Sequence, residues 1–384
     1  MTTPPAYLNY FTDEHHMLRQ SVRRFVEREI APFIQAWEEA GAFPRELYRR
    51  MAELGLTGIG YPEAYGGVPG DIFAQITAWE ELMRAGSGGL VAGLGSLHIA
   101  IPPILALGTE AQKARWVRPA LAGERIAALA VTEPGGGSDV ANLRTTAVRE
   151  GDVYRVNGSK TFITSGCRAE QLTCAVRTGA PGVGGISLLV IEADTPGYSA
   201  SQPLPKMGWW ASDTAQLFFE DCRVPVENLI GPENMGFYAL MVNFQRERLQ
   251  LAVMANMTAQ LALEAALAYV KEREAFGRTL AGFQVIRHKI VDMATLVEVS
   301  REFTYRVAAK MNAGLDQTTE ISMAKNFSTD TSDKVTYEAV QIFGGYGYMR
   351  EYLVERLYRD NRLLSIGGGT REIMKEIIAR RLLG

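Results

Sequence analysis

The apolar residues in the first third of the chain recur at helical spacing. Between Leu18 and Ile30 they fall three or four positions apart, which places them on one face of a helix, and Thr12 is a suitable N-cap before them. Pro44 can open a second helix that ends at Gly55, and a third helical pattern covers residues 71–84. Helical character continues to about residue 108. We therefore expect a helical N-terminal region.

The pattern changes to short apolar runs between about residues 125 and 230. Residues 153–156 precede Asn157-Gly158, a dipeptide typical of two-residue hairpin turns, and residues 160–164 would form the returning strand. Residues 186–191 and 217–220 predict two further strands, and from residue 235 the pattern is helical again. This order indicates an α+β protein, which we divide into an N-terminal helical domain (1–124), a middle β domain (125–232) and a C-terminal helical bundle (233–384).

Composition and charge narrow the possible functions. The chain has 384 residues and 47% hydrophobic content, enough for two or three packed domains. Its net charge of −3 argues against binding to nucleic acid or to an anionic membrane, and it has no run of about 18 apolar residues. The segment after Met1 has neither a basic nor an apolar stretch, so we expect a cytoplasmic protein.

Histidine and cysteine do not predict a metal site. The three cysteines have no metal-ligand spacing, and their odd number is compatible with a reducing compartment. The pair His15-His16 lacks a third ligand at suitable spacing, and we interpret it as a surface patch. We therefore expect no bound metal.

Residues 130–139, Ala-Val-Thr-Glu-Pro-Gly-Gly-Gly-Ser-Asp, are the most informative segment for function. Pro134 fixes its own backbone φ, whereas the three glycines that follow can adopt any φ. Such a loop can direct its amide groups and the hydroxyls of Thr132 and Ser138 toward a phosphate or a flat heteroaromatic ring. Taken alone, this spacing is equally compatible with an ordinary glycine-rich turn between two strands.

A second glycine-rich segment favours the functional interpretation. Residues 341–370 read QIFGGYGYMREYLVERLYRDNRLLSIGGGT. The two segments together resemble the two signatures of the flavin-dependent acyl-CoA dehydrogenases. The first departs from the family pattern at Asn142, and the second matches it from Gln341 to Asp360. Residues 62–67, 206–208 and 273–277 match as well, so the resemblance covers almost the whole chain.

The resemblance implies a fold, a cofactor and partners. The family has an N-terminal helical domain, a β-barrel-like middle domain and a C-terminal four-helix bundle through which it forms homotetramers. Its members use FAD to oxidise an acyl-CoA to the 2-enoyl-CoA in β-oxidation, and they pass the electrons to an electron-transfer flavoprotein. The chain has neither a Rossmann fingerprint nor a P-loop, so FAD would bind in the family's own crevice between the middle domain and the C-terminal helices.

The positions that match the family's FAD contacts fall into two groups. The group for the flavin ring lies in the middle domain, where Phe162 occupies a stacking position that is often Trp in the family; the hydrophobic core is the alternative place for this side chain. The group for the adenine and pyrophosphate lies in the C-terminal half, partly on a neighbouring subunit, and Arg273 could equally be a solvated charge. The first group is Leu129, Val131, Thr132, Gly137, Ser138, Phe162 and Thr164, and the second is Arg273, Phe276, Gln284, Gln341, Ile342, Gly344, Gly345, Thr370 and Glu372.

The reaction requires a carboxylate that removes the proton α to the thioester carbonyl. In many family members this glutamate precedes the Gly-Thr of the last glycine run, but the residue here is Gly368, which cannot accept a proton. Glu247, in the sequence Gln-Arg-Glu-Arg-Leu, instead matches the base of the long-chain and isovaleryl subgroups, which tend to lack an acid at the other position. Taken alone, Glu247 could be a solvent-facing helix residue. The glycine at 368 favours Glu247 as the base.

The remaining expectations concern the substrate. Small residues at 91–99 and in the last glycine run predict a roomy pocket, which favours a medium-to-long or methyl-branched acyl chain. A short branched chain of the isovaleryl type is the alternative. A flavin oxidase that reacts with oxygen and a catalytically silent acyl-CoA-binding homologue are further hypotheses, and Glu247 argues against the silent one. The candidate substrate-binding residues are Ser138, Gln245, Arg248, Gly367 and Gly368.

Overall fold

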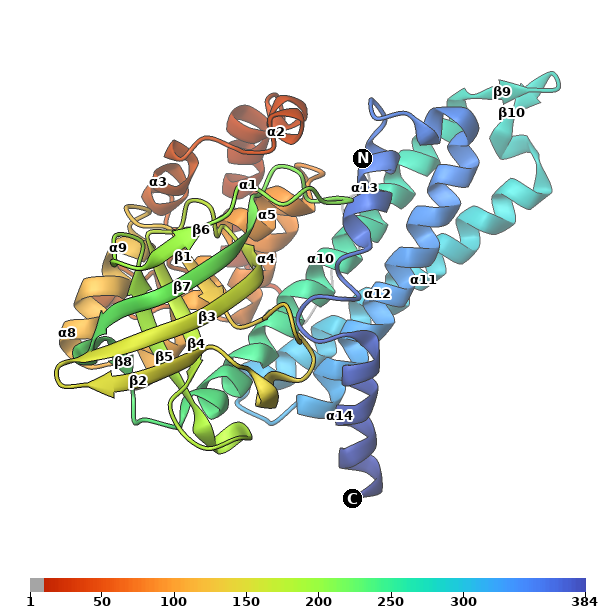
Figure 1. Cartoon of the computed structure of the whole chain (residues 1–384). Helices are drawn as coiled ribbons and strands as arrows, with labels where there is room; N and C mark the ends of the chain where they lie inside the picture. The colour runs from red at the N-terminus through yellow and green to blue at the C-terminus, as the bar shows by residue number, and fades with distance from the viewer. Residues whose placement is uncertain (1–9) are drawn as a thin grey trace.

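The computed structural model describes residues 10–384 and has the expected order of a helical, a β and a second helical region (Figure 1). The N-terminal helices and the sheet lie on one side of the molecule, and the long C-terminal helices lie on the other (Figure 1). The segment after Met1 that we expect to carry no targeting signal lies outside the described residues.

The N-terminal region consists of short and medium helices. The first begins after Thr12, as predicted, and the glycine-rich segment after Gly86 contains a helix because the Ser87 hydroxyl accepts a hydrogen bond from the Leu90 amide at 3.1 Å. The helices are α1 (Asp13–Phe25), α2 (Ile34–Ala40), α3 (Glu46–Glu53), α4 (Ile72–Met83), α5 (Gly88–Leu94), α6 (Leu97–Ala100), α7 (Pro102–Leu107), α8 (Glu110–Gln112) and α9 (Arg118–Leu121), with π-helical turns at Val26–Ile30 and Lys113–Val117.

His15 is buried, so the prediction of a surface patch at His15-His16 was wrong for this residue. Its Nδ1 accepts a hydrogen bond from the Thr12 amide at 2.9 Å, and its Nε2 lies 2.9 Å from Oδ1 of Asp71. Asp71, its polar partner, directly precedes α4. Helical spacing within α1 does not show that α4 packs against His15, so the sequence could not predict its burial. His15 therefore joins two helices rather than facing solvent.

The middle region is an eight-stranded sheet. Its strand order is β6-β7-β3-β2-β4-β5-β8, and β1 pairs with β4 beside this path. β5, which covers the predicted strand at residues 186–191, is buried along almost its whole length, and so is β4, which was not predicted. The strands are β1 (Ala127–Ala130), β2 (Thr146–Glu150), β3 (Val153–Thr164), β4 (Gln171–Arg177), β5 (Ile186–Glu192), β6 (Tyr198–Ala200), β7 (Thr214–Pro225) and β8 (Leu229–Ile230).

β3 is one continuous strand, so the hairpin turn predicted at Asn157-Gly158 was wrong. The pairing of β3 with β7 shifts register between Val156 and Gly158, which is a β-bulge. Gly158 has φ +143°, and a β-carbon on it would lie 2.7 Å from the backbone of Thr145. The dipeptide therefore marks a close approach of two backbones, and local sequence alone does not distinguish that from a turn.

The C-terminal region is a bundle of long helices. α10 is long and apolar enough to cross a membrane by length and composition, but 72% of its most apolar window is buried inside the protein. The helices α5 to α7 would meet the same test as one bent span. The elements are α10 (Gly236–Glu272), β9 (Glu274–Ala275), β10 (Arg278–Thr279), α11 (Gln284–Asn312), α12 (Thr318–Phe343), α13 (Leu353–Asn361) and α14 (Arg371–Leu383).

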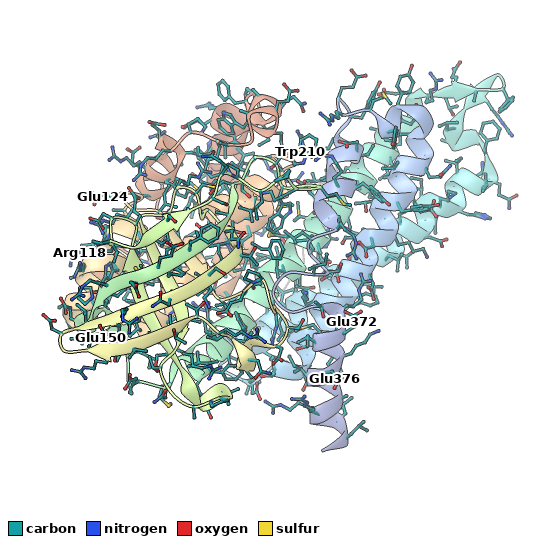
Figure 2. All side chains as sticks on the ribbon, viewed as in Figure 1. Arg118, Glu124, Glu150, Trp210, Glu372 and Glu376 are labelled. Carbon is teal, nitrogen blue, oxygen red and sulfur yellow. The ribbon has the colours of Figure 1, made fainter. Side chains whose placement is uncertain are left out.

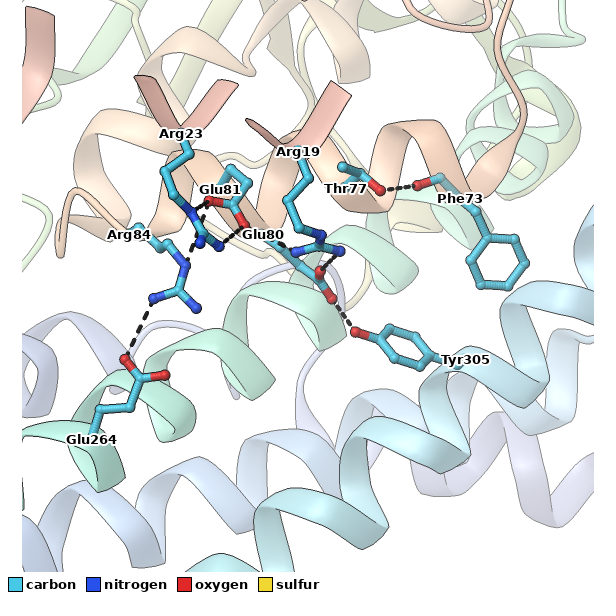
Figure 3. Close-up of polar contacts among 9 residues, drawn as sticks. All are labelled: Arg19, Arg23, Phe73, Thr77, Glu80, Glu81, Arg84, Glu264 and Tyr305. Carbon is cyan, nitrogen blue, oxygen red and sulfur yellow. Dashed lines mark hydrogen bonds and ion pairs between the residues drawn. The ribbon is translucent and has the colours of Figure 1, made fainter. Parts of the chain in front are cut away.

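A cluster of buried charges holds α4 against its neighbours (Figure 3). Every residue of α4 is buried, including two acids. Glu81 accepts hydrogen bonds from Arg19 at 3.0 Å and from Arg23 at 2.8 Å. Glu80 accepts one from Arg19 at 2.7 Å and another from the Tyr305 hydroxyl. The cluster connects α4 to α1 and α11, and so fixes the N-terminal helices against the C-terminal bundle.

Candidate active site

Glu247 of α10 faces the last glycine run of the chain. Gly368 has φ +63°, and a β-carbon built on it would lie 3.5 Å from Oε1 of Glu247. The same β-carbon would overlap the side chain of Leu251. Positions 247 and 368 are 121 residues apart in the chain, yet side chains at both would point to the same place.

The Glu247 side chain is half-buried, and its two carboxylate oxygens differ in their exposure. Its Oε2 is shielded from solvent and has no hydrogen-bond partner among the described residues. Burial raises the pKa of Glu247 to about 7, and the positive charges of Arg248 and Lys325 oppose that rise. A carboxyl group with this pKa is partly ionised at neutral pH and is a stronger base than an exposed glutamate.

Lys325 of α12 supports the glycine run, and sequence reasoning missed it. Its ammonium group donates hydrogen bonds to the carbonyl oxygens of Gly367 at 2.8 Å and Gly369 at 2.5 Å. The side chain is fully buried, and desolvation lowers its pKa to about 8. One signal in the sequence could have indicated it. Lys325 lies four positions after the apolar Ile321 in a helix of small residues, and this spacing places the lysine on the buried face.

The other two candidate substrate residues on α10 have different surroundings. Gln245 donates a hydrogen bond to the Thr318 hydroxyl at 2.9 Å. Arg248 is buried, and its Nε has no hydrogen-bond partner in the part of the chain that the structure describes. Their roles in binding a substrate stay predictions.

A buried ion pair anchors the glycine loop after β1. The Lys160 ammonium lies 2.8 Å from Oε1 of Glu133, which also accepts a hydrogen bond from the Thr145 amide at 2.8 Å. The loop leaves Ser138 exposed and Thr132 half-buried. The anchoring roles of Lys160 and Glu133 were not predicted, because the two residues lie on different segments and the sequence does not show that they meet.

Phe162 is not a core residue. Its side chain is 70% exposed, and its φ of +60° is unusual for an aromatic residue. The pairing of β3 with β7 is irregular between Lys160 and Ile163, so the strand bulges at this point. A flat apolar side chain that a strained backbone holds outside the core offers a surface on which a ring can stack.

A cavity extends from Glu247 into the N-terminal region. Its volume is about 30 Å³. α3, α4 and α5 supply an apolar wall, and part of the predicted segment 91–99 contributes to it. The lining residues are Met51, Leu56, Ile59, Tyr61, Gln75, Ala78, Trp79, Leu82, Val91, Leu94, Gly95, His98, Arg246, Glu247 and Gln250.

The family models for the N-terminal, middle and C-terminal domains of acyl-CoA dehydrogenase match residues 12–124, 128–222 and 234–383. The chain belongs to the acyl-CoA dehydrogenase family. It is 41% identical to an acyl-CoA dehydrogenase of Bacillus subtilis, over 98% of this chain and 99% of that one. It is 39% identical to the mitochondrial long-chain specific acyl-CoA dehydrogenase of Rattus norvegicus, over 97% and 87%. A crystal structure of an acyl-CoA dehydrogenase from Geobacillus kaustophilus superposes with a TM-score of 0.95 at 44% identity, over 97% and 99%.

These findings confirm the fold, the class of enzyme and the cofactor that the sequence predicts. Acyl-CoA dehydrogenases are FAD-dependent oxidoreductases. A crystal structure of an acyl-CoA dehydrogenase from Bacillus anthracis complexed with FAD superposes with a TM-score of 0.91 at 31% identity, over 100% of this chain and 68% of that one. The exposed Phe162 and the anchored loop at Thr132 fit a flat cofactor ring in this acyl-CoA dehydrogenase.

The second group of predicted FAD residues lies far from the first. Arg273 and Phe276 belong to the hairpin of β9 and β10, which projects at the end of the helical bundle remote from the sheet (Figure 1). Phe276 is 96% exposed at its tip. A hollow of about 440 Å³ includes four of the residues in this group, namely Arg273, Ile342, Gly344 and Gly345, while Gln284 and Gln341 are exposed. The two groups do not meet within one chain of this acyl-CoA dehydrogenase.

Thr370 and Glu372 occupy a third place, at the start of α14. The Thr370 hydroxyl accepts a hydrogen bond from the Ile373 amide at 3.3 Å and caps the helix. Glu372 is exposed on the first turn of α14 (Figure 2). Trp210 lies away from it, where the sheet domain meets α13 (Figure 2). In the first group, Leu129 and Val131 are half-buried where β1 enters the glycine loop, Gly137 is exposed within it, and Thr164 ends β3. The roles of these residues in binding FAD stay predictions.

Proposed function

We propose that Glu247 is the base of this acyl-CoA dehydrogenase and removes the α-proton of the acyl-CoA. The observation that carries the proposal is the 3.5 Å separation between Oε1 of Glu247 and a β-carbon built on Gly368. Oε1 is the carboxylate oxygen on the side of Gly368, where the substrate would lie. When bound, FAD supplies the acceptor for the hydride that leaves the β-carbon.

The residues around Glu247 have supporting roles in this proposal. Lys325 holds the carbonyl oxygens of the glycine run in fixed positions, so that Gly368 leaves room for a substrate beside the carboxyl group. Partial burial of the carboxyl group raises its pKa to about 7. The exposed Phe162 and the hydroxyl of Thr132 would support and orient the flavin ring.

Anaerobic addition of an acyl-CoA to the yellow protein tests the reaction. Bleaching of the flavin band is the expected result. Tight binding of the acyl-CoA without bleaching would support the silent homologue instead. Turnover that is faster with oxygen than with an artificial acceptor would support the oxidase.

We infer a medium-to-long or methyl-branched acyl chain as substrate, with a short branched chain of the isovaleryl type as the alternative. The long apolar wall from α3 to α5 supports this inference. Relatives do not decide the chain length, since the long-chain specific rat enzyme and a short-chain specific enzyme of Clostridium acetobutylicum are each 39% identical to this chain. Comparison of kcat/KM over straight and branched acyl-CoAs tests it. The highest value for straight butyryl-CoA would contradict it.

We also propose a homotetramer in which each FAD contacts two subunits. The separation of the hairpin at Arg273 from the loop at Thr132 supports a shared site, because one chain does not bring both to the same cofactor. Light scattering of the FAD-loaded protein should give four times the mass of the chain. A monomer that retains FAD at micromolar concentration would contradict the shared site.

The proposed electron acceptor is an electron-transfer flavoprotein, and the proposed setting is β-oxidation in the cytoplasm. The three cysteines are free thiols, which is compatible with a reducing compartment. Reduction of a purified electron-transfer flavoprotein in the presence of acyl-CoA tests the first proposal. Fractionation of cells with an antibody against the protein tests the second, and recovery outside the cytoplasm would contradict it.

A further inference from the structure

Two buried carboxyl groups lie at the junction of α2, α5 and α13. Glu38 of α2 and Asp360 of α13 are each only 3% exposed. At the start of α5, the Ser87 hydroxyl donates a hydrogen bond to Oε1 of Glu38 at 2.5 Å. The next residue, Gly88, donates its amide hydrogen to Oδ2 of Asp360 at 3.0 Å. Both acids also contact residues 209–211, the segment before β7, so they hold the same junction from two different helices.

The two acids differ in how well their oxygens are satisfied. Each oxygen of Asp360 accepts a backbone amide hydrogen, one from Gly88 and one from Trp209 at 2.6 Å. Oε2 of Glu38 is shielded from solvent and has no hydrogen-bond partner among the described residues. Amide donors stabilise the ionised form of a carboxyl group, and the one amide contact of Glu38, from Ala211, is long at 3.4 Å. Glu38 is therefore the better place for a proton.

No positively charged side chain pairs with either acid in the part of the chain that the structure describes. Lys206 lies in the same region, but its ammonium group donates to oxygen atoms of nearby serine and threonine residues. On α13, Arg359 bonds to a glutamate of its own helix and to a carbonyl group, and Arg356 bonds to a glutamine and to another carbonyl group. Asp213, also nearby, pairs with Arg168 at 2.8 Å. These charged groups are therefore engaged with other partners.

The electrostatics of the junction disfavour two negative charges. Burial and the charge of Glu38 raise the pKa of Asp360 to about 7, although its two amide hydrogen bonds and the charge of Arg359 oppose the rise. Burial also lowers the pKa of Lys206 to about 8, against the opposing charges of both acids. A dry site that destabilises charges of either sign is most stable when it contains few of them.

We propose that Glu38 and Asp360 share one proton, held on Glu38, and that loss of this proton at higher pH loosens the junction. Unfolded acids release such a proton near about pH 4, whereas the folded junction keeps it up to about pH 7. The stability that the proton contributes is therefore complete below about pH 4 and is lost as the pH rises through 7. α13 leads into the last glycine run, opposite Glu247, so the junction fixes the helix that precedes this part of the candidate active site. This role is independent of the proposed reaction.

Thermal unfolding of the FAD-loaded protein between pH 5 and pH 8 tests the proposal. Glu38→Gln keeps the size of the side chain and imitates the neutral acid, so its stability should not depend on this proton. Between these two pH values the Tm of the wild type should fall by roughly 3 °C relative to that of Glu38→Gln. Glu39→Gln, at the next and exposed position of α2, is the matched control and should follow the wild type. Parallel curves for the wild type and Glu38→Gln would overturn the proposal.

Hydrogen exchange gives a local measurement that needs no variant. After correction for the intrinsic effect of pH, wild-type peptides that cover residues 205–213 and 353–361 should lose at least roughly tenfold of their protection between pH 5 and pH 8. Unchanged protection in both peptides would overturn the proposal.

Asp360→Asn tests where the proton is held. Its amide group would face a backbone N–H in place of an oxygen, so this variant should have a lower Tm than the wild type at both pH values. If Asp360→Asn instead keeps the Tm of the wild type at pH 5 and removes the pH dependence, the assignment of the proton to Glu38 is overturned.

Discussion

Glu247 and Gly368 face each other across the candidate active site, with 3.5 Å between Oε1 of the glutamate and a β-carbon built on the glycine. An acid at either position would project into the same space. The resemblance to the family implies that members differ in which of the two positions has the acid. The geometry gives that exchange a physical basis, because a side chain at position 368 would reach the place that the Glu247 carboxyl group occupies.

A glutamate placed at position 368 instead of 247 should act as the base only after Leu251 is replaced by a smaller residue. In the Glu247→Gln background, Gly368→Glu places a side chain at φ +63° and against Leu251, so it should restore little of the rate of flavin reduction. Adding Leu251→Ala removes the overlap and should increase the restored rate. Stopped-flow absorbance of the double and triple variants measures this. Equal rates in both would show that Leu251 does not limit the position of the new acid.

Flavin reduction should depend on pH through Glu247. The pKa of this carboxyl group is raised to about 7 and the base acts only when ionised, so the rate should rise with pH and reach half its maximum near pH 7. Lys325→Met removes a positive charge that favours the carboxylate and should move the midpoint to higher pH. Lys310→Met, at an exposed position of α11, is the control. An unchanged midpoint in the Lys325 variant would show that the charge of Lys325 does not affect the pKa of Glu247.

The buried cluster around α4 should contribute measurably to stability. Glu81→Gln removes a carboxylate that two arginines contact at 3.0 Å or less, and its side chain has no exposure. We expect the free energy of unfolding to fall by roughly 2–3 kcal/mol, since the arginines retain some access to solvent. Urea denaturation measures the change, and Glu53→Gln at an exposed position is the control. A loss below about 0.5 kcal/mol would show that the cluster is no more than a surface pair.

Much of the fold could be predicted from the sequence, because helical spacing and continuous apolar runs report local structure directly. The start of α1 at Thr12 and the buried strand β5 are examples. The prediction at Asn157-Gly158 was wrong because local sequence does not decide the structure there. The same dipeptide suits a turn and a bulge, and the packing of Thr145 against Gly158 decides between them.

The candidate site could be predicted only where a motif carried the information. Glu247 and Gly368 could be assigned together because the family pattern links them. Lys325 lies in a helix without a motif, and its proximity to the site depends on how α10 and α12 pack. Long-range packing of this kind leaves no signal in a single sequence.

Anaerobic stopped-flow reduction of the Glu247→Gln variant tests most directly whether Glu247 removes the α-proton. We expect that FAD and acyl-CoA still bind, while the flavin band bleaches at least roughly 10²-fold more slowly than in the wild type, the usual scale for a lost general base. Glu272→Gln, at the exposed end of α10, should reduce at the wild-type rate. Reduction of the Glu247→Gln protein at nearly the wild-type rate would contradict the assignment.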